Sequence, residues 1–230
     1  MSGTAAPPRR VLLVQLRRLG DVVLTAGLLE DLRAALPDAE LDFLVGKAAA
    51  PLLARHPLIA TRIVYDAERA LHMARVVRAR RYDWVIDVQS SPRTAMLARL
   101  SGAPVRAGWG IGFWAWVYTH VLPRSGRAPE YVVRERQRFL EMLGVPVGAP
   151  RTRLALTPEE RDAGEALLRA AGVPEGRARV ALVLSAANRV REWPVERFAE
   201  LATALLAEGA APVALENPGD EARVARLRAL

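Results

Sequence analysis

Two arginines, a glycine and an aspartate follow the first apolar run of the sequence and could form part of a ligand site. They are Arg17, Arg18, Gly20 and Asp21. Ligands of open α/β sheets bind beyond the carboxyl ends of the strands, so this turn is a candidate site. Gly20 would allow a tight turn, and Asp21 would lie at a helix N-terminus, which stabilises a carboxylate. Asp21 is therefore either an ordinary helix cap or a catalytic carboxylate that the two arginines keep ionised. The arginines could also bind a phosphate or carboxylate.

A second polar run, Gln89 to Arg93, follows another apolar run. Ser91 and Pro92 have the chemistry of a helix start, with serine as the N-cap and proline as the first helical residue. The position after a strand still makes Gln89, Ser90 and Arg93 candidates for the same cleft.

A third polar run covers residues 185–194, between an apolar run and a helix that we expect from Pro194. Ser185, Asn188 and Arg191 could bind a phosphate there, because a loop that ends in a helix N-terminus is a common anion site. The run contains no G-K-[ST] sequence and is not a Walker loop. The alternative is a solvated basic loop.

The glycine-rich stretch G-W-G-I-G at residues 108–112 resembles a dinucleotide fingerprint only superficially. The third glycine of G-x-G-x-x-G would be residue 113, which is phenylalanine. Two interpretations stay open: a loop over a bulky, partly apolar ligand, or an ordinary loop whose tryptophans enter the core.

Composition excludes several kinds of site. The sequence has no cysteine and 3 histidines, so a disulfide framework, a thiolate zinc site and a cysteine nucleophile are excluded, and we expect no metal centre. The net charge is +8, and residues 88–138 carry eight arginines against two glutamates, which is +6 of that total. Such a local excess favours an anionic partner: a phosphorylated substrate, a membrane surface or nucleic acid.

Short apolar runs alternate with helical patterns, which predicts βαβ units and a parallel sheet buried on both faces. The expected strands of the first part are residues 11–16, 41–45, 62–65, 84–88 and 105–107. The expected helices there are 22–36, 47–55, 68–80, 92–100 and 130–143. The second part is predicted to contain helices at 158–171, 194–208 and 220–229 and strands at 180–184 and 212–215.

A Gly/Pro-rich linker at residues 144–150 predicts a domain boundary. We therefore expect a disordered tail at 1–10, a first domain at 11–150 and the opening part of a second domain at 151–230. The longest apolar stretches are far too short for a membrane-spanning helix or a signal peptide. We expect a cytoplasmic protein.

Four motifs in order make the sequence resemble glycosyltransferase family 9, the ADP-heptose:lipopolysaccharide heptosyltransferases. The similarity extends over residues 10 to 230. The motifs are R-L-G-D-V-V-L-T at 18–25, L-D-F-L-V-G at 41–46, Y-D-W-V-I-D-V-Q-S-S-P-R at 82–93 and R-E-W-P-V-E-R-F-A-E-L at 191–201.

The resemblance implies an α/β protein of the GT-B type: a complete N-terminal Rossmann-like domain that binds the acceptor, and an incomplete second one that binds the nucleotide sugar. It implies an inverting transfer of heptose, or a related sugar, from an ADP-sugar to a lipopolysaccharide inner-core acceptor. The ADP-sugar is a substrate, and no cofactor is expected. The enzyme would lie in the cytoplasm, in peripheral contact with the inner membrane.

The family pattern also assigns roles to residues. The G-D motif makes Asp21 the general base, a role that suits a carboxylate. The basic residue before W-P, here Arg191, would meet the donor diphosphate, with Ser185 and Asn188 beside it. The expected acceptor-binding residues are Arg17, Arg18, Gly20, Gln89, Ser90, Arg93 and Arg124.

The sequence departs from the family pattern in four places. The glycine-rich turn near Leu215 reads E-N-P-G-D at residues 216–220. The proline that commonly follows G-D is lost in Thr25-Ala26-Gly27, and Ala186 and Ala187 supply no side-chain donor. The family's later aspartate and D-S-G…H-x-A-A stretch have no counterpart before Leu230. The alternative function is a truncated, inactive relative that binds anionic glycans or glycolipids. Nucleic-acid binding is less favoured, because the arginines lie in no recognised nucleic-acid motif.

Overall fold

The computed structural model describes residues 7–110, 112–124, 130–186 and 188–230. The chain divides into a first unit, Met1–Leu156, and a second unit, Thr157–Leu230, whereas the linker composition placed the division between residues 150 and 151. Residues 1–6 of the expected tail lie outside the described residues. Arg10 is already the first residue of a strand, because it pairs with Glu40 of the neighbouring strand, and its N–H and that of Arg9 also donate to the Asp83 carboxylate.

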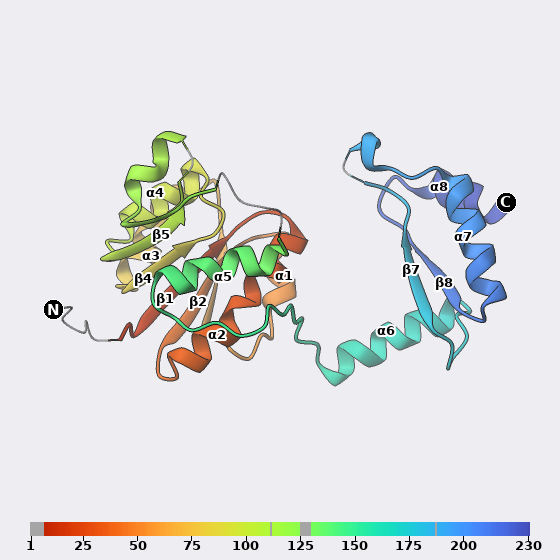
Figure 1. The fold of residues 1–230 in the computed structure, drawn as a ribbon, viewed down its shortest axis with the longest axis horizontal. Coiled ribbons are helices and arrows are strands. Elements are labelled where there is room, and N and C mark those ends of the chain that lie inside the picture. Colours follow the sequence, from red (N-terminus) through yellow and green to blue (C-terminus); the bar gives the residue numbers. More distant parts are fainter. Residues whose placement is uncertain (1–6, 111, 125–129, 187) are drawn as a thin grey trace. The chain divides into compact units, whose positions relative to one another are not determined.

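The first unit is built on a six-stranded parallel sheet in the order β3-β2-β1-β4-β5-β6 (Figure 1). The strands are β1 (Arg10–Gln15), β2 (Glu40–Gly46), β3 (Thr61–Tyr65), β4 (Trp84–Asp87), β5 (Val105–Trp109) and β6 (His120–Leu122). The first five confirm the predicted strands. The sixth was not predicted, because its three residues are too few to show a pattern.

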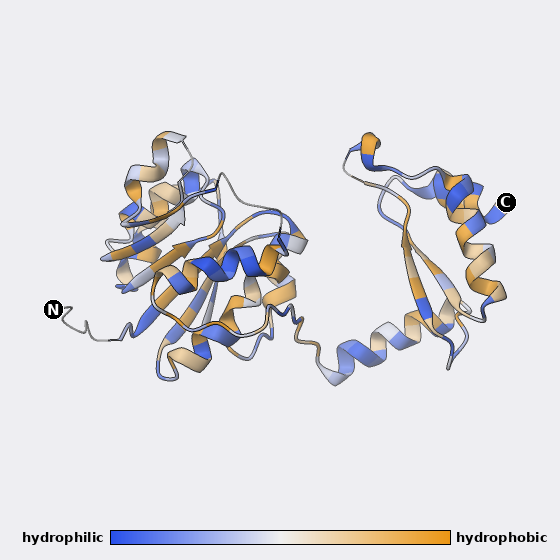
Figure 2. Cartoon of the chain, viewed as in Figure 1, coloured by the Kyte–Doolittle hydropathy of each residue, from blue (hydrophilic) through white to orange (hydrophobic). Residues whose placement is uncertain are grey.

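Helices cover both faces of this sheet. They are α1 (Leu19–Ala26), α2 (Leu28–Ala35), α3 (Ala70–Ala79), α4 (Pro92–Leu100) and α5 (Val132–Met142), with 3-10 helices η1 (Ala50–Leu53) and η2 (Gly112–Val117). One core lies under α1, α2 and α5 and is centred on Phe43 and Phe139, while the other lies under α3, α4 and η2 and includes Val77 and Leu97. In Figure 2 much of α5 is blue, whereas the strands carry orange stretches beside blue ones.

Two helix predictions were wrong in detail. The predicted helix 22–36 is two helices that meet at Gly27, where a β-carbon would lie 2.3 Å from the Arg151 carbonyl oxygen. The predicted helix 47–55 is reduced to η1, because Pro51 lacks the N–H that an α-helix needs.

The second unit contains a two-stranded parallel sheet of β7 (Arg179–Val183) and β8 (Ala211–Leu215). Around it lie α6 (Pro158–Ala170), η3 (Arg189–Arg191), α7 (Val195–Ala207) and α8 (Glu221–Ala229). Its small core consists of Leu182, Leu184 and Val224, with Phe198 packed against it. The strands and helices predicted for this part of the chain are confirmed.

Across the described ranges of the chain, no helix is both long enough and apolar enough to cross a membrane.

Candidate active site

A cavity of about 1080 Å³ opens at the carboxyl edge of the first unit's sheet. Its walls come from the ends of β1 to β4 and from the first residues of α3 and α4. Four of its side chains are basic, two are acidic, and the excess is positive. The charged lining residues are Arg17, Lys47, Asp66, Glu68, Arg69 and Arg93. An anionic ligand therefore suits this cavity better than a cationic one.

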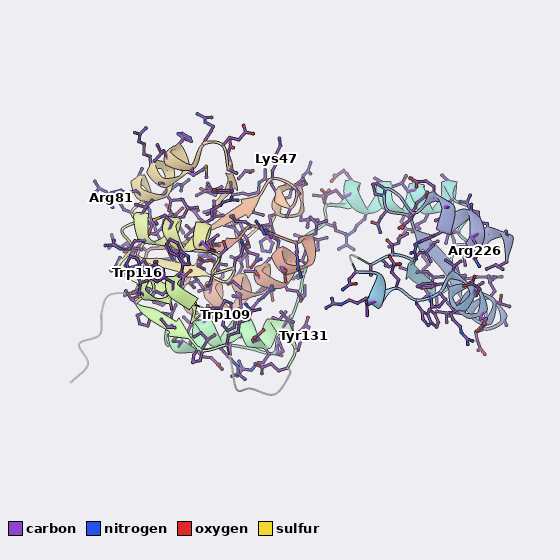
Figure 3. The ribbon with its side chains drawn as sticks, turned by 90° about the horizontal axis from the view of Figure 1, so that it is seen from above. Lys47, Arg81, Trp109, Trp116, Tyr131 and Arg226 are labelled. Atoms are coloured by element: carbon purple, nitrogen blue, oxygen red, sulfur yellow. The ribbon has the colours of Figure 1, made fainter. Side chains whose placement is uncertain are left out.

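The structure brings three of the predicted acceptor residues, Arg17, Gln89 and Arg93, into this cavity. Arg18, Gly20, Asp21, Ser90 and Arg124 are not among its lining residues. Sequence reasoning missed Lys47, which follows β2 and is labelled in Figure 3, and Arg69 and His72 near the start of α3. The rule that ligands bind beyond strand ends would have found them if applied to β2 and β3 as well.

Gln89 fixes the turn between β1 and α1. Its Oε1 accepts hydrogen bonds from the N–H groups of Leu16 (2.8 Å) and Arg17 (3.0 Å), and its Nε2 donates to Ser91 Oγ at 3.2 Å. The Gln89 amide therefore positions the cavity wall and is already engaged within the protein.

Ser91 is the N-cap of α4, as predicted. Its Oγ accepts from the Thr94 N–H, and Thr94 Oγ1 accepts from the Ser91 N–H at 2.9 Å, with Pro92 as the first helical residue. Arg93 follows, and its guanidinium lies 5.7 Å from the centre of the Tyr65 ring.

Ser90 is engaged within the protein and is not among the residues that line the cavity. Its backbone is left-handed (φ 48°), its N–H donates to Asp87 Oδ1 at 2.8 Å, and its Oγ accepts from the Trp109 N–H at 2.8 Å. Asp87 is fully buried and also accepts from the Tyr118 hydroxyl at 2.7 Å. Burial raises the pKa of Asp87 to about 6.

Near the glycine-rich stretch, Trp109 enters the core and Trp116 is exposed, so the ordinary-loop interpretation fits one tryptophan and the ligand-loop interpretation fits the other. Trp109 is buried, donates from Nε1 to the Val88 carbonyl at 2.8 Å and meets Phe139 edge to face. Arg124 lies 5.7 Å from the Trp109 ring centre. Phe113 and Trp116 are exposed. Ile111 lies outside the described residues.

Asp21 lies in the first turn of α1 and is not its N-cap, because the helix begins at Leu19 and Arg18 precedes it. The tight turn expected at Gly20 is formed at Arg18, whose φ is 59°, and Gly20 lies inside the helix. Asp21 thus follows closely in the chain after Arg17, which lines the cavity.

The ionic partner of Asp21 is Arg136 of α5, and the expectation that Arg17 and Arg18 fill this role was wrong. Arg136 Nη2 lies 2.7 Å from Asp21 Oδ1, and its Nη1 donates to the Asp21 carbonyl at 2.5 Å and to Thr25 Oγ1 at 2.9 Å. The Arg136 side chain is 7% exposed and that of Asp21 is 33% exposed. Burial lowers the pKa of Arg136, while the contact with Asp21 favours its charged form.

One carboxylate oxygen of Asp21 is thereby fixed and the other is available. Within the described ranges, no hydrogen bond engages Asp21 Oδ2. A partly exposed carboxylate whose orientation is set by a buried arginine can accept a proton from a hydroxyl placed beside it.

The predicted donor residues lie in the second unit, on the loop after β7 and in η3. Ser185 Oγ donates to Asp220 Oδ2 at 2.8 Å and accepts from Asn217 Nδ2 at 3.2 Å. The Ser185 hydrogen bond is the main cause that lowers the pKa of Asp220. Asp220 lies between β8 and α8, and its contact with the loop after β7 was not predicted.

Asn188 and Arg191 belong to one turn. The Arg191 N–H donates to the Asn188 carbonyl at 2.9 Å, and Asn188 Oδ1 accepts from the Val190 N–H at 3.1 Å. Arg191 is exposed, and none of the ion pairs between described residues involves it. Its guanidinium is available for an anionic ligand.

A smaller cavity of about 450 Å³ lies elsewhere in the second unit, between the start of α7 and α8. Its arginines are already paired, Arg223 with Glu192 and Arg226 with Glu196. None of the predicted donor residues lines it. The described ranges also contain no group of three or more His, Cys, Asp or Glu side chains that could hold a metal ion.

The family model described as glycosyltransferase family 9 (heptosyltransferase) matches residues 70–230. Lipopolysaccharide heptosyltransferase 3 of Escherichia coli is 26% identical over 213 residues, which are 86% of this chain and 61% of that protein. Lipopolysaccharide core heptosyltransferase OpsX of Haemophilus influenzae is 22% identical over 204 residues, 85% of this chain and 56% of that protein. The chain thus spans somewhat more than half the length of these relatives.

Solved structures confirm the fold. The glycosyl transferase family 9 structure from Veillonella parvula has a TM-score of 0.80 and 23% identity, covering 95% of this chain and 65% of that one. E. coli ADP-heptose lps heptosyltransferase II has a TM-score of 0.73 and 20% identity, and the match covers 96% of this chain and 69% of that one. The predicted α/β fold of GT-B type, with a full first Rossmann-like unit and part of a second, is confirmed.

Proposed function

Because the chain belongs to glycosyltransferase family 9, we propose that it transfers a heptose, or a related sugar, from an ADP-sugar to an inner-core acceptor of lipopolysaccharide, with inversion at the anomeric carbon. The observation that carries the proposal is the basic cavity beside the Asp21 turn, which suits an anionic acceptor. Both relatives described above are named as lipopolysaccharide heptosyltransferases. E. coli heptosyltransferase WaaC, which shares this fold, was solved with ADP and with ADP-2-deoxy-2-fluoro heptose.

The acceptor side of the reaction is assigned to the first unit. Arg17, Lys47, Arg69 and Arg93 would hold the anionic groups of the acceptor in the cavity. Arginine suits this task, since its guanidinium can donate two parallel hydrogen bonds to a phosphate or carboxylate.

The donor side is assigned to the loop after β7. Arg191 would balance the charge of the ADP diphosphate, and Asn188 and Ser185 shape the turn that presents it. The reaction is then a single displacement. Asp21 Oδ2 takes the proton of the acceptor hydroxyl, the hydroxyl oxygen forms a bond to the anomeric carbon, and the bond from that carbon to the diphosphate breaks. The products are the glycosylated acceptor and ADP, with the proton on Asp21.

The protein would act in the cytoplasm, in peripheral contact with the inner membrane where its phosphorylated glycolipid acceptor lies. It would need no cofactor, because the ADP-sugar is itself the substrate.

Calorimetry with each substrate, followed by mass spectrometry of the acceptor, tests this function. The proposal predicts that ADP-heptose binds, that a deacylated inner-core acceptor binds, and that the acceptor gains one heptose unit with release of ADP. Failure of ADP-heptose to bind would refute it.

A second candidate is a module that binds anionic glycans or glycolipids without catalysis. The favouring observation is that the basic cavity is formed entirely by residues of the first unit. Binding of the acceptor alone, with no binding of ADP-heptose, would identify the module.

A further inference from the structure

The face of the first unit formed by α3, α4 and η2 has an unusual composition. These three elements, described in full, contain no aspartate or glutamate and carry four arginines, Arg75, Arg78, Arg93 and Arg99. The helices on the opposite face, α1, α2 and α5, are mixed, with four arginines against five acidic residues. The positive charge is thus concentrated on one face of the sheet.

The same face exposes large apolar side chains. Phe113 is 78% exposed and Trp116 is 59% exposed, and their ring centres lie 6.4 Å apart. They are three residues apart in a 3-10 helix, a spacing that places both on the same side. Trp116 lies at the periphery of the first unit in Figure 3. Figure 2 shows η2 in pale to orange colours, in contrast to the blue outer side of α5.

Arginines and apolar residues share the outer stripes of both helices. On α3, Leu71, Arg75 and Arg78 are exposed at a spacing of i, i+4 and i+7. On α4, the exposed Met96 lies between Arg93 and Arg99 in the sequence, and the exposed Leu100 follows Arg99. The two stripes meet where Arg78 Nη1 donates to the Leu100 carbonyl at 3.5 Å.

We propose that the face formed by α3, α4 and η2 docks on an anionic lipid bilayer. Aromatic and aliphatic side chains that enter the interface, surrounded by arginines that meet anionic headgroups, are the features of a surface that lies on a membrane. Acidic side chains, which the headgroups would repel, are absent from all three elements. Nucleic acid fits less well, because it offers nothing to the exposed Leu71, Met96 and Leu100.

The docking face is continuous with the candidate site. His72 and Met73 of α3 and Pro92 and Arg93 of α4 line the basic cavity. A bilayer on this face would therefore present the headgroup region of an anionic glycolipid to the cavity entrance. This inference rests on the proposed function for the identity of that glycolipid, while the lipid contact itself is measured without any sugar substrate.

Sedimentation with vesicles tests the contact. The wild-type protein is expected to bind vesicles of phosphatidylcholine and phosphatidylglycerol more tightly than phosphatidylcholine alone. Replacing Phe113→Ser and Trp116→Ser together is expected to weaken binding to the mixed vesicles by about tenfold or more. Arg75→Gln with Arg78→Gln is expected to weaken it by about tenfold at low salt, and to leave binding to phosphatidylcholine unchanged.

The matched control is Leu167→Ser with Leu206→Ser, which removes two exposed apolar side chains of the second unit. This pair is expected to bind vesicles like the wild type. Equal vesicle binding by the Phe113/Trp116 variant and the wild type would overturn the proposal. The proposal would also be overturned if that variant lost self-association or nucleic-acid binding and still bound vesicles like the wild type.

A milder variant keeps the test valid if the double serine variant fails to fold. Trp116→Phe keeps the apolar contact, so vesicle binding is expected to persist while quenching of tryptophan fluorescence by brominated lipid falls. Unchanged quenching would overturn the proposal. Absence of heptose transfer to a lipid-free acceptor by the wild type would refute the proposed function only, and leaves vesicle binding as a separate measurement.

Discussion

Arg136 and Asp21, on helices that are far apart in the sequence, form an ion pair of 2.7 Å between a buried guanidinium and a partly exposed carboxylate, and the arginine also donates to the Asp21 carbonyl. The guanidinium therefore fixes both the helix turn and one carboxylate oxygen of the proposed base. It also ties α5 to α1 on one face of the sheet.

Arg136→Gln is expected to reduce kcat by about tenfold to a hundredfold, because the Asp21 carboxylate loses its fixed orientation. It is also expected to lower the free energy of unfolding by about 1–3 kcal/mol, since a nearly buried side chain loses its hydrogen bonds to Asp21 and Thr25 while the Asp21 carboxylate stays partly exposed. Steady-state kinetics and urea denaturation measure the two effects. The control is Arg134→Gln on the same helix, which removes an exposed pair with Glu141 and should change stability by less than about 1 kcal/mol. Equal effects of the two substitutions would contradict the positioning role.

Arg191→Ala is expected to weaken ADP-heptose binding by about tenfold to a hundredfold, the usual loss for a charge-assisted hydrogen bond. Stability should change little, because Arg191 is exposed and forms no ion pair with a described residue. Calorimetry measures the affinity. Arg197→Ala, which removes another exposed arginine of the second unit, should leave the affinity unchanged. Undiminished binding by Arg191→Ala would remove this residue from the donor site.

Asp87 is expected to give the stability of the protein a pH dependence. Its pKa is raised to about 6 in the folded state, so the folded state holds a proton that the unfolded state releases at lower pH. The free energy of unfolding should therefore fall by a few kcal/mol as pH rises from about 4 to about 6, and this contribution should be constant above that range. Denaturation curves of the wild type and Asp87→Asn over this range measure it. The variant should lack this fall, and parallel pH profiles would contradict the assignment.

Gly27→Ala is expected to destabilise the protein by about 2 kcal/mol or more, because a β-carbon there would lie 2.3 Å from the Arg151 carbonyl oxygen. Gly164→Ala is the matched control, since a β-carbon at that helical position meets nothing within 4 Å. It should stabilise the protein by about 0.5–1 kcal/mol. Thermal unfolding of both variants gives the comparison, and similar shifts would contradict the close approach at Gly27.

The sheet could be predicted from the sequence because its strands are short apolar runs buried on both sides. The runs that became β1, β2 and β4 are almost entirely buried, and apolar patterning alone identifies such strands. The three-residue β6 shows no such pattern. The break at Gly27 depends on Arg151, which is distant in sequence, so local helix periodicity could not reveal it.

The site was predictable where it depends on strand ends and not where it depends on pairing between distant helices. Arg17, Gln89 and Arg93 follow strands and do line the cavity. Arg136 is one of eight arginines in residues 88–138, and nothing in its local sequence distinguishes the arginine that meets Asp21 from the others. Ser90 also follows a strand, but its backbone is left-handed and its contacts go to Asp87 and Trp109.

Asp21→Asn provides the most direct test of the proposed mechanism. The asparagine keeps the size and can still accept a hydrogen bond from Arg136, but it cannot take the proton of the acceptor hydroxyl. Heptose transfer is expected to fall by at least about a hundredfold, while calorimetry should give the wild-type affinity for ADP-heptose. Transfer at a rate close to that of the wild type would contradict the assignment of Asp21 as the base.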